Sequence, residues 1–503
     1  MSSTALSMPS ATALARHQAA VASSRAMWRT LLFICSALVA ALALYSIVSA
    51  PSVTNEWPYV VAGCFVAWAG LYLLATYRYF GTPYLFVSAY VLCLAVFHLG
   101  HLFAHVTGLY DLVSLVRGPM AFWHQQAGWY VLLSFAFLGI GAAVAMTARP
   151  ALVQVTEPDP EQVARTLRYT FWIGVGLLCA SFAALLLTVG SVGNLLRFSR
   201  SEIFRGVGDT RGFGFFLMVV PSAAVLLVAG ARTRLQRLFA YGFAVVLVLA
   251  VLFLGYRSSV MFPGLVAAIL WVKLGRKIPL TVAAAALLAV IVAIPTVSYL
   301  RAQGAYQDLS QKDLEKSLEQ AEDSKGILLE LGGVSTVVAY VVKTVPDEWP
   351  YRLGQSYWMA FVNAIPNVGL DMEQGGRSEF LSKGVADKKA LSVMHPADWY
   401  TYIVDRWLFE RGGGAGFSTI AEAYLNFGVL GVMGFFYAVG FLLARLDQQD
   451  LRRNPNLLVI AGAMLWPLLK TVRNSFDVFL KPLAFILVSI WIWKLITFWR
   501  HRQ

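Results

Sequence analysis

Long apolar runs separated by short polar connections dominate this sequence. An α-helix needs about 20 apolar residues to cross the hydrocarbon core of a bilayer, and a dozen runs reach that length. The sequence therefore predicts an all-α integral membrane protein of about twelve transmembrane helices. A helix hairpin inside the long polar segment would raise the number to thirteen or fourteen. The predicted spans are 29–50, 57–77, 83–105, 127–147, 170–192, 213–231, 238–255, 258–274, 278–299, 418–444, 456–472 and 478–498.

The composition agrees with this pattern. Of the 503 residues, 58% are hydrophobic and only 13% are charged. Soluble domains carry about 25% charged residues, so this chain has too few charges to cover a water-facing surface. The four cysteines fall within predicted spans, where they are expected to pack as small apolar side chains.

Lysine and arginine recur on every second connection, as the positive-inside rule requires of cytoplasmic loops. This pattern predicts that both termini are cytoplasmic, and it attributes the net charge of +13 to topology and anionic lipid, not to nucleic acid. The inner basic residues are Arg16, Arg25, Arg29, Arg78, Arg149, Arg165, Arg168, Arg232, Arg234, Arg237, Lys273, Arg276, Lys277, Arg445, Arg452, Arg453, Lys494, Arg500 and Arg502.

Four regions follow from these spans. Residues 1–27 are predicted to be a disordered cytoplasmic N-terminus, and residues 28–299 to hold nine transmembrane helices with an Arg-rich outer loop at 193–212. Residues 300–417 form a large extracytoplasmic loop containing helices, and residues 418–503 hold the last three spans. Within the loop, the apolar stretch 327–345 is predicted to pack over a site or to dip into the membrane, because Glu330 and a Gly-Gly pair interrupt it; a full crossing stays open.

The outer connections break the charge rule, and they do so with arginine alone. The residues are Arg197 and Arg205 in the first of these loops, Arg257 in a short turn, Arg301 at the end of a span and Arg473 between the last two spans. Arginine presents a planar fork of donors that recognises phosphate bidentately and stays charged. Any single one of them has an alternative role in pairing with local acids or reaching to lipid headgroups. As a set they indicate an extracytoplasmic anion site, which a lipid-linked diphosphate would fit.

A glycine-rich stretch at 412–416 leads into an apolar run that begins at Ser418. Backbone N–H groups and the helix dipole at such a helix start favour an anion. Glu422 has two interpretations here: Thr419 and Glu422 have the spacing of a capping box, which needs no further role, and Glu422 also faces the expected mouth of the site.

The run Gly416-Phe-Ser-x-x-x-Glu-x-Tyr-x-Asn-Phe-Gly-x-x-Gly431 just ahead of a late span resembles the oligosaccharide repeat-unit polymerases, the O-antigen polymerase (Wzy-type) group. The resemblance extends over about residues 195–480. It also includes Arg257 opening a span, Arg301 ending one, the run from Gly354 to Pro366, and Arg473 in a late turn. The spacing from Arg197 to Gly208 matches the arginine-led outer loops of that group as well.

The resemblance implies a GT-C-like membrane glycosyltransferase that polymerises undecaprenyl-diphosphate-linked repeat units for O-antigen, capsule or exopolysaccharide. The reaction would be inverting, would need no metal or other cofactor, and would take place at the periplasmic face of the bacterial inner membrane. A chain-length co-polymerase protein is an expected partner. The implied diphosphate clamp is Arg257, Arg301 and Arg473, assisted by Arg197 and Arg205.

The acceptor hydroxyl must lose a proton in such a reaction, so a carboxylate or an imidazole is needed as base. The candidates are Glu422 and His395, with Asp398 and Asp405 in reserve. Contacts to the glycan or the loop are predicted for Tyr357, Ser418, Tyr424 and Asn426.

The sequence leaves three alternatives to this interpretation. His98, His101 and His105 lie on one helix face, as metal ligands would, but no nearby acid or cysteine completes a set, so packing or substrate hydrogen bonding is favoured. An O-antigen-ligase-type enzyme would share the donor; Ser418 and Gly428-x-x-Gly431 keep the spacing of such ligases, but Phe417 stands where they have a His. A transporter or flippase for lipid-linked sugar is disfavoured, because the sequence shows no internal repeat and its polar residues gather at the outer face.

Overall fold

The computed structural model describes residues 11–109, 117–146, 158–189, 211–253, 258–279, 281, 332–364, 388–410 and 413–500. Their regular structure is helical, without strands in these ranges. The helices are α1 (Ala11–Ser49), α2 (Trp57–Phe80), α3 (Phe86–Val106), α5 (Ala121–Ala145), α6 (Pro160–Val189), α9 (Arg211–Gly230), α10 (Arg234–Phe253), α11 (Ser258–Lys273), α15 (Val334–Thr344), α16 (Gln355–Ala364), α18 (Lys388–Val393), α19 (Pro396–Val404), α20 (Arg406–Glu410), α21 (Thr419–Asp447), α22 (Pro455–Thr471) and α23 (Asp477–Arg500).

Eight of these helices are long and apolar enough to cross a membrane, which confirms the prediction of a multi-pass membrane protein. They are α1, α2, α3, α5, α6, α10, α21 and α23. Shorter apolar helices, α9, α11 and α22, occupy three further predicted spans. The predicted span 278–299 lies almost entirely outside the described residues, so the total of twelve stays a prediction.

The N-terminal helix differs from the prediction. α1 begins at Ala11, so residues 11–27 are helical where disorder was expected. The physical reason is the alanine-rich composition of this stretch, since alanine has the highest intrinsic helix propensity and does not need an apolar face to form a helix.

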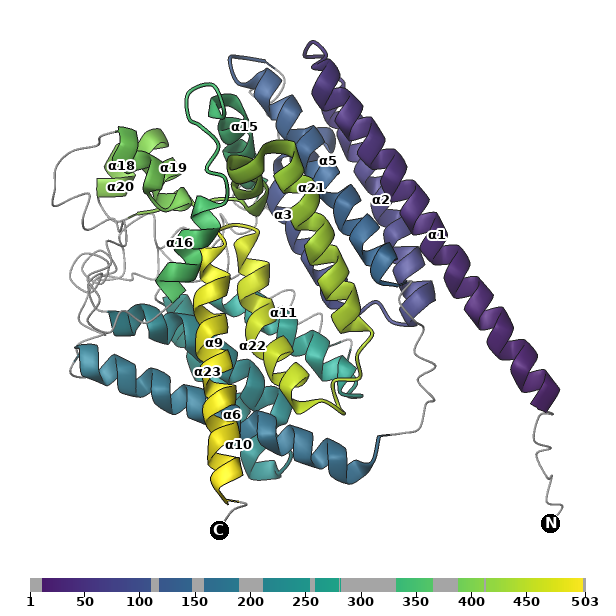
Figure 1. The fold of residues 1–503 in the computed structure, drawn as a ribbon, viewed down its shortest axis with the longest axis vertical. Helices are drawn as coiled ribbons and strands as arrows, with labels where there is room; N and C mark the ends of the chain where they lie inside the picture. Colours follow the sequence, from purple (N-terminus) through teal and green to yellow (C-terminus); the bar gives the residue numbers. More distant parts are fainter. Residues whose placement is uncertain are drawn as a thin grey trace.

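The helices form two adjoining groups, each with its own buried apolar cluster. The first cluster includes residues of α1, α2, α3, α5, α11, α15 and α21, the second includes residues of α6, α10 and α23, and α9 and α22 contribute to both. In Figure 1 the purple α1 runs along one edge of the molecule, while α22 and α23 stand at the centre beside α9 and in front of the tilted α6. Helix α22 also packs against α3 and α11, so it connects the two groups.

Helices α5 and α21 approach each other closely because each has a glycine at the crossing. A Cβ on Gly141 of α5 would overlap the backbone of Tyr437, and a Cβ on Gly440 of α21 would overlap the carbonyl of Leu138. Small residues at a helix crossing allow backbones to pack directly in a membrane protein. This contact fixes the position of α21, which follows directly after Gly416-Phe417-Ser418.

Helix α21 is broken near its start. Phe427 (φ −138°, ψ 18°) and Gly428 (φ 60°, ψ −143°) leave helical geometry, so a short segment at 419–426 precedes the main helix. The break frees carbonyl groups, and the loop before α16 satisfies two of them: Arg352 N donates to Leu425 O (2.9 Å) and Leu353 N donates to Asn426 O (3.0 Å). The predicted span 418–444 is therefore two helical segments, and the break anchors α16 beside the first.

The short helices of the long polar segment gather at one end of the bundle. Figure 1 shows α15, α18, α19 and α20 there, at the end where the short segment of α21 also lies, and α16 running down from that end beside α23. Helix α15 has 11 residues and a buried apolar face against α3, α5 and α21. These 11 residues span about 16 Å, against about 30 Å of hydrocarbon. Residues 327–331 lie outside the described residues, so the alternatives for 327–345 stay predictions.

Candidate functional site

The site is built around the start of α21. Ser418 is the N-cap: its side chain accepts hydrogen bonds from Ile420 N (3.1 Å) and Ala421 N (3.3 Å). Thr419 Oγ1 donates instead to Thr471 O at the end of α22 (2.5 Å). The capping box of Thr419 and Glu422 is therefore not formed, because a different residue caps the helix and both members of the box bond elsewhere.

Glu422 lies one turn inside α21 and is 1% exposed. Its Oε1 accepts a hydrogen bond from Ser356 Oγ (2.7 Å) and its Oε2 accepts one from the backbone N of Phe476 (2.7 Å). Asn426 holds the Ser356 hydroxyl in turn, because its Nδ2 donates to Ser356 Oγ (2.7 Å) and to Glu422 O (2.8 Å). Each carboxylate oxygen of Glu422 thus has one fixed donor, which orients the group.

The turn between α22 and α23 is docked onto this segment. Phe417 N donates to Arg473 O (3.1 Å), two residues before Thr419 meets the end of α22. The same turn supplies the amide of Phe476 to Glu422. Three separate contacts therefore hold residues 471–476 against residues 417–422, although the two stretches belong to different helices.

His395 contacts Ser475 and Asp477 of the same α22–α23 turn. His395 Nε2 lies 2.8 Å from Asp477 Oδ1 and 2.8 Å from Ser475 Oγ, and Ser475 Oγ donates to Asp477 Oδ1 (2.9 Å). Ser475, Phe476 and Asp477 are consecutive, so a single turn positions both leading base candidates of the sequence analysis. The imidazole also interacts electrostatically with Glu422.

The carboxylates around His395 determine its charge state. Burial by itself disfavours the imidazolium, but the attraction and hydrogen bond of the Asp477 carboxylate outweigh it, with Asp398 and Glu422 adding to the effect, and raise the pKa of His395 to about 9. Its Nδ1 lies 3.9 Å from Asp398 Oδ2. At neutral pH His395 is therefore a cation paired with Asp477, and not a free base.

Arg352 supports the position of His395. Its Nη1 donates to Met394 O (2.6 Å), the carbonyl directly before His395, and its guanidinium lies 5.4 Å from the ring centroid of Trp399 on α19. Burial lowers the pKa of Arg352 to about 10, while the Glu422 carboxylate favours its charged form. Since its backbone N also bonds the broken end of the first α21 segment, Arg352 joins α21 to the His395 loop.

Most of the predicted diphosphate clamp falls on residues that the structure does not describe. Arg197, Arg205, Arg257 and Arg301 lie outside the described ranges. Arg473 is described: its carbonyl accepts from Phe417, and its guanidinium lies 5.9 Å from the ring centroid of Phe97. The structure therefore brings one of the five predicted arginines to the turn that holds Glu422 and His395.

The remaining predicted acids differ in their surroundings. Asp398 lies in the first turn of α19, close to His395. Asp405 accepts a hydrogen bond from Leu408 N (2.9 Å) and so caps the short helix α20, with an exposed side chain. Asp405 thus has a local structural role that the sequence alone did not indicate.

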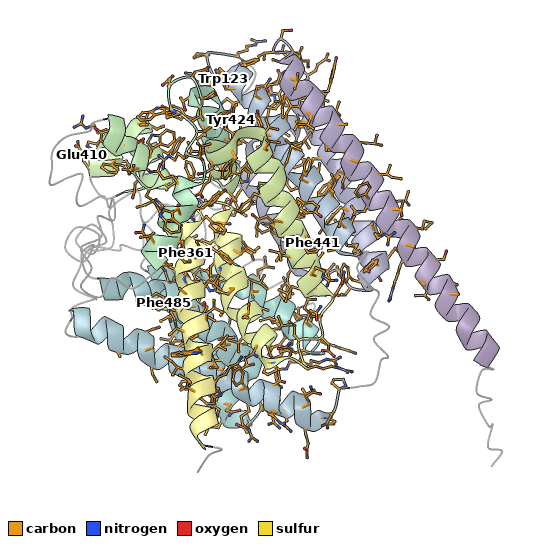
Figure 2. The ribbon with its side chains drawn as sticks, viewed as in Figure 1. Trp123, Phe361, Glu410, Tyr424, Phe441 and Phe485 are labelled. Atoms are coloured by element: carbon orange, nitrogen blue, oxygen red, sulfur yellow. The ribbon has the colours of Figure 1, made fainter. Side chains whose placement is uncertain are left out.

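The predicted glycan contacts are part of the interior of the site. Ser418 and Asn426 are fully buried and bonded within the protein. The Tyr424 hydroxyl donates to Val345 O (3.3 Å), and the Tyr357 ring packs edge-on against Phe476 at 5.4 Å between centroids. Figure 2 shows Tyr424 at the end of the bundle beside α15 and Phe441 farther down α21.

His98, the first of the three histidines on one face of α3, is hydrogen-bonded within the protein. His98 Nδ1 lies 3.1 Å from Leu94 O and its Nε2 lies 2.7 Å from Ser418 Oγ. Since a carbonyl only accepts, Nδ1 carries the proton and Nε2 accepts from the Ser418 hydroxyl. Both ring nitrogens are thus engaged, and the described residues contain no group of three His, Cys, Asp or Glu side chains arranged for a metal.

Sequence reasoning missed four side chains that organise the site: Arg352, Ser356, Ser475 and Asp477. Arg352 and Ser356 flank the Gly354-Gln run, and Ser475 and Asp477 follow Arg473, so the stretches were noted for other residues. Single polar residues in loops and turns give no periodic signal. Their partners are evident only once α16 and the α22–α23 turn are docked onto α21.

The geometry offers an oriented carboxylate next to a cationic imidazole, with an arginine-bearing turn between them. Such a set can accept a proton from a hydroxyl through Glu422 and can stabilise negative charge through His395 and Arg473. The group lies at the start of α21, where the helix dipole also favours an anion.

Comparison with known proteins identifies one family. The family model described as O-antigen polysaccharide polymerase Wzy matches residues 31–503, which is nearly the whole chain. Comparison with curated proteins and with solved structures found no match.

Proposed function

This chain belongs to the O-antigen polysaccharide polymerase Wzy family, and we propose that it joins undecaprenyl-diphosphate-linked repeat units by inverting, metal-independent glycosyl transfer. Membership in the family implies an O-antigen repeat-unit polymerase working in the membrane. The finer mechanism rests on one observation, the buried Glu422 carboxylate held by Ser356 and Phe476 beside the His395–Asp477 pair.

In the proposed reaction the growing glycan is the donor, and its anomeric carbon carries the lipid diphosphate. A hydroxyl of the incoming repeat unit attacks that carbon from the opposite face, a new glycosidic C–O bond forms, and the bond to the diphosphate oxygen breaks. The hydroxyl proton passes to Glu422, and the negative charge leaves with the lipid diphosphate. One base and one set of cations are sufficient for this step.

We assign the base to Glu422 and not to His395. The raised pKa keeps His395 protonated at neutral pH, so it cannot take a proton there. As a cation it instead helps to offset the charge that develops on the leaving diphosphate. Asp398 and Asp405 remain reserve carboxylates, of which only Asp398 lies beside His395.

For the diphosphate we propose Arg473 together with Arg257 and Arg301, with Arg197 and Arg205 assisting. The position of Arg473 on the turn that holds Glu422 supports this assignment. Ser418 and Asn426 would keep the start of α21 in place, while Tyr357 and Tyr424 line the site from within. Arginine suits this role because its donors match phosphate oxygens in pairs.

The setting proposed for this reaction is the bacterial inner membrane, with both termini in the cytoplasm and the site facing the periplasm. The alternation of Lys and Arg along the connections supports that orientation. A chain-length co-polymerase is a proposed protein partner.

Purified protein incubated with lipid-diphosphate repeat units tests the proposal, with products separated on a gel. A ladder of lipid-linked oligomers is expected. Transfer only to a foreign acceptor would identify a ligase, and transport without a glycan product would identify a flippase; either would overturn the proposal.

Variants test the residues. Glu422→Gln keeps the shape of the side chain but removes the base, so the ladder should disappear while size-exclusion profile and melting temperature stay close to wild type. Arg257→Ala and Arg301→Ala should have the same effect. Glu410→Gln is the matched control, because Glu410 is exposed and, among the described residues, forms its ion pair with Arg406 on its own helix; its ladder should be normal. Full activity in the first three variants would reject the proposed site.

A further inference from the structure

An open groove lies at the far end of the bundle from Glu422. It has a volume of about 420 Å³ and is lined by residues from α6, from the connection between α9 and α10, from the end of α11 and from the connection between α21 and α22. Glu422 lies in the first turn of α21, whereas the groove includes Arg452, just beyond the last residue of that helix. The groove is therefore separate from the site described above.

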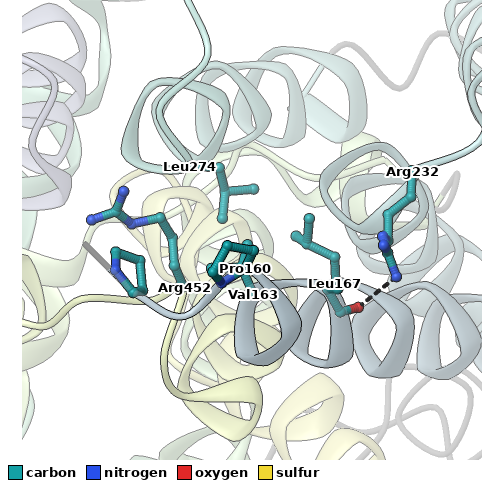
Figure 3. Close-up of a pocket in the computed structure, with 8 residues that line it drawn as sticks. Pro160, Val163, Leu167, Arg232, Leu274 and Arg452 are labelled. Atoms are coloured by element: carbon teal, nitrogen blue, oxygen red, sulfur yellow. Dashed lines mark hydrogen bonds between the residues drawn. The ribbon is translucent and has the colours of Figure 1, made fainter. Parts of the chain in front are cut away.

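Two arginines border the groove. Figure 3 shows Arg232 on one side and Arg452 on the other, with Val163, Leu167 and Leu274 between them. A groove with an arginine at each end and apolar side chains between them suits a ligand that has both an anionic head and apolar chains.

The two arginines differ in their partners. Arg452 is already paired with Asp450, with Nε–Oδ1 2.9 Å and Nη2–Oδ2 3.1 Å. Arg232 donates from Nη1 to Ala164 O on α6 (3.1 Å), and no described carboxylate lies within ion-pair distance of it. Its other guanidinium donors stay available to the groove, so Arg232 is the cation that can take an anion.

The surroundings carry a net positive charge. The stretches 158–168, 232–237, 273–277 and 445–453 together hold eleven Lys or Arg and four Asp or Glu. Two of those acids are engaged in contacts of their own: Asp447 with Lys273 and with the start of α3, and Asp450 with Arg452 and Arg453. Asp159 and Glu161, at the start of α6, are exposed. An anion at Arg232 therefore meets a favourable field.

We propose that this groove binds the phosphate headgroup of an anionic phospholipid, with Arg232 as its main partner and the acyl chains against Val163, Leu167 and Leu274. Basic pockets between the ends of transmembrane helices bind anionic lipid heads in this way. The bound lipid contacts α6, the end of α11 and the α21–α22 connection together.

The test is binding of lipid to the full-length protein in detergent, followed by native mass spectrometry and by melting temperature. The added ligands are phosphatidylglycerol, phosphatidylcholine and inorganic phosphate, each alone. Phosphatidylglycerol should be retained and should raise the melting temperature; phosphatidylcholine and inorganic phosphate should do neither to the same degree.

Arg232→Gln should weaken phosphatidylglycerol binding by about tenfold, which corresponds to about 1.4 kcal/mol. Because Arg232 is exposed, the variant is expected to fold, and Arg232→Glu provides a second variant with reversed charge. Arg165→Gln is the matched control, since Arg165 is an exposed arginine of α6 outside the groove lining.

Three outcomes would overturn the proposal. Equal binding of phosphatidylcholine would remove the role of charge, and an equal effect of inorganic phosphate would make this a phosphate site without lipid. An equal loss in the Arg165→Gln variant would show a general surface effect. None of these measurements uses the polymerase reaction, so the result is independent of the proposed function.

Discussion

Ser356 on α16 donates a hydrogen bond to Glu422 on α21, with 2.7 Å between Ser356 Oγ and Glu422 Oε1, although 66 residues separate them. The contact exists because the break in α21 binds the loop before α16 through Arg352 N and Leu353 N. The backbone break, the loop and the buried carboxylate therefore form one unit.

Ser356→Ala should reduce polymer formation without removing it. The substitution deletes one donor to a charged group, an interaction worth about 1.5–3 kcal/mol, and leaves Asn426 Nδ2 with only the Glu422 carbonyl. A loss of this size in the transition state corresponds to a rate reduction of about ten- to a hundredfold. Initial rates of ladder formation measure it. Ser489→Ala is the control, because the Ser489 hydroxyl donates to Phe485 O within its own helix. An unchanged rate for Ser356→Ala would contradict the role of the Ser356–Glu422 contact.

Stability should depend on pH through His395. The pKa of His395 is raised to about 9 in the folded protein, against about 6.5 in an unfolded chain. The His395–Asp477 pair therefore contributes its full stability below about pH 6.5, and that contribution is lost as the pH rises through about 9.

Melting temperatures of the wild type and of His395→Gln between pH 6 and pH 10 check this. The difference between them should be largest at the acidic end and should shrink as the pH rises, since groups common to both proteins cancel. A difference that stays constant across the range would contradict the charged pair.

Gly428→Ala should destabilise the protein by about 1–3 kcal/mol, because a non-glycine residue is strained in such a conformation. Gly428 has φ 60° and ψ −143°, and a Cβ there would lie 3.1 Å from the Tyr351 hydroxyl. Gly434→Ala, in the regular part of the same helix with open space around its Cβ position, should be neutral or slightly stabilising. Chemical or thermal denaturation measures both; equal effects would show that the break in α21 does not require glycine.

Arg352→Gln should lower activity and stability together. It removes the donor to Met394 O, and a buried carbonyl left without its partner costs about 1–3 kcal/mol. If Arg352 positions His395, the pH dependence of activity should change as well. Arg352→Lys should restore only part of the activity and of the stability, because a lysine cannot form the same planar contacts. Arg406→Gln is the control, since the Arg406 side chain is 67% exposed and pairs with Glu410 on the same short helix. An unchanged pH profile of activity in Arg352→Gln would show that Arg352 contributes to stability and does not position His395.

Local patterns were sufficient for much of the fold. The apolar runs gave helices in eleven of the twelve predicted ranges because crossing a bilayer demands length and hydropathy, which are properties of a continuous stretch. The helix upstream of Trp28 was missed because polar composition outweighed alanine propensity in the prediction.

The candidate site was likewise predictable in part from the sequence and in part only from the tertiary structure. The sequence by itself determined a membrane protein with a glycine-led helix start, and it picked out Glu422 and His395, because composition, charge alternation and a local motif can be read along the chain. Only the tertiary structure decided that Ser418 caps the helix, that Ser356 and Phe476 orient Glu422, and that Asp477 keeps His395 charged. These relationships depend on contacts between distant segments and on burial, and neither is encoded in the spacing of residues within one segment.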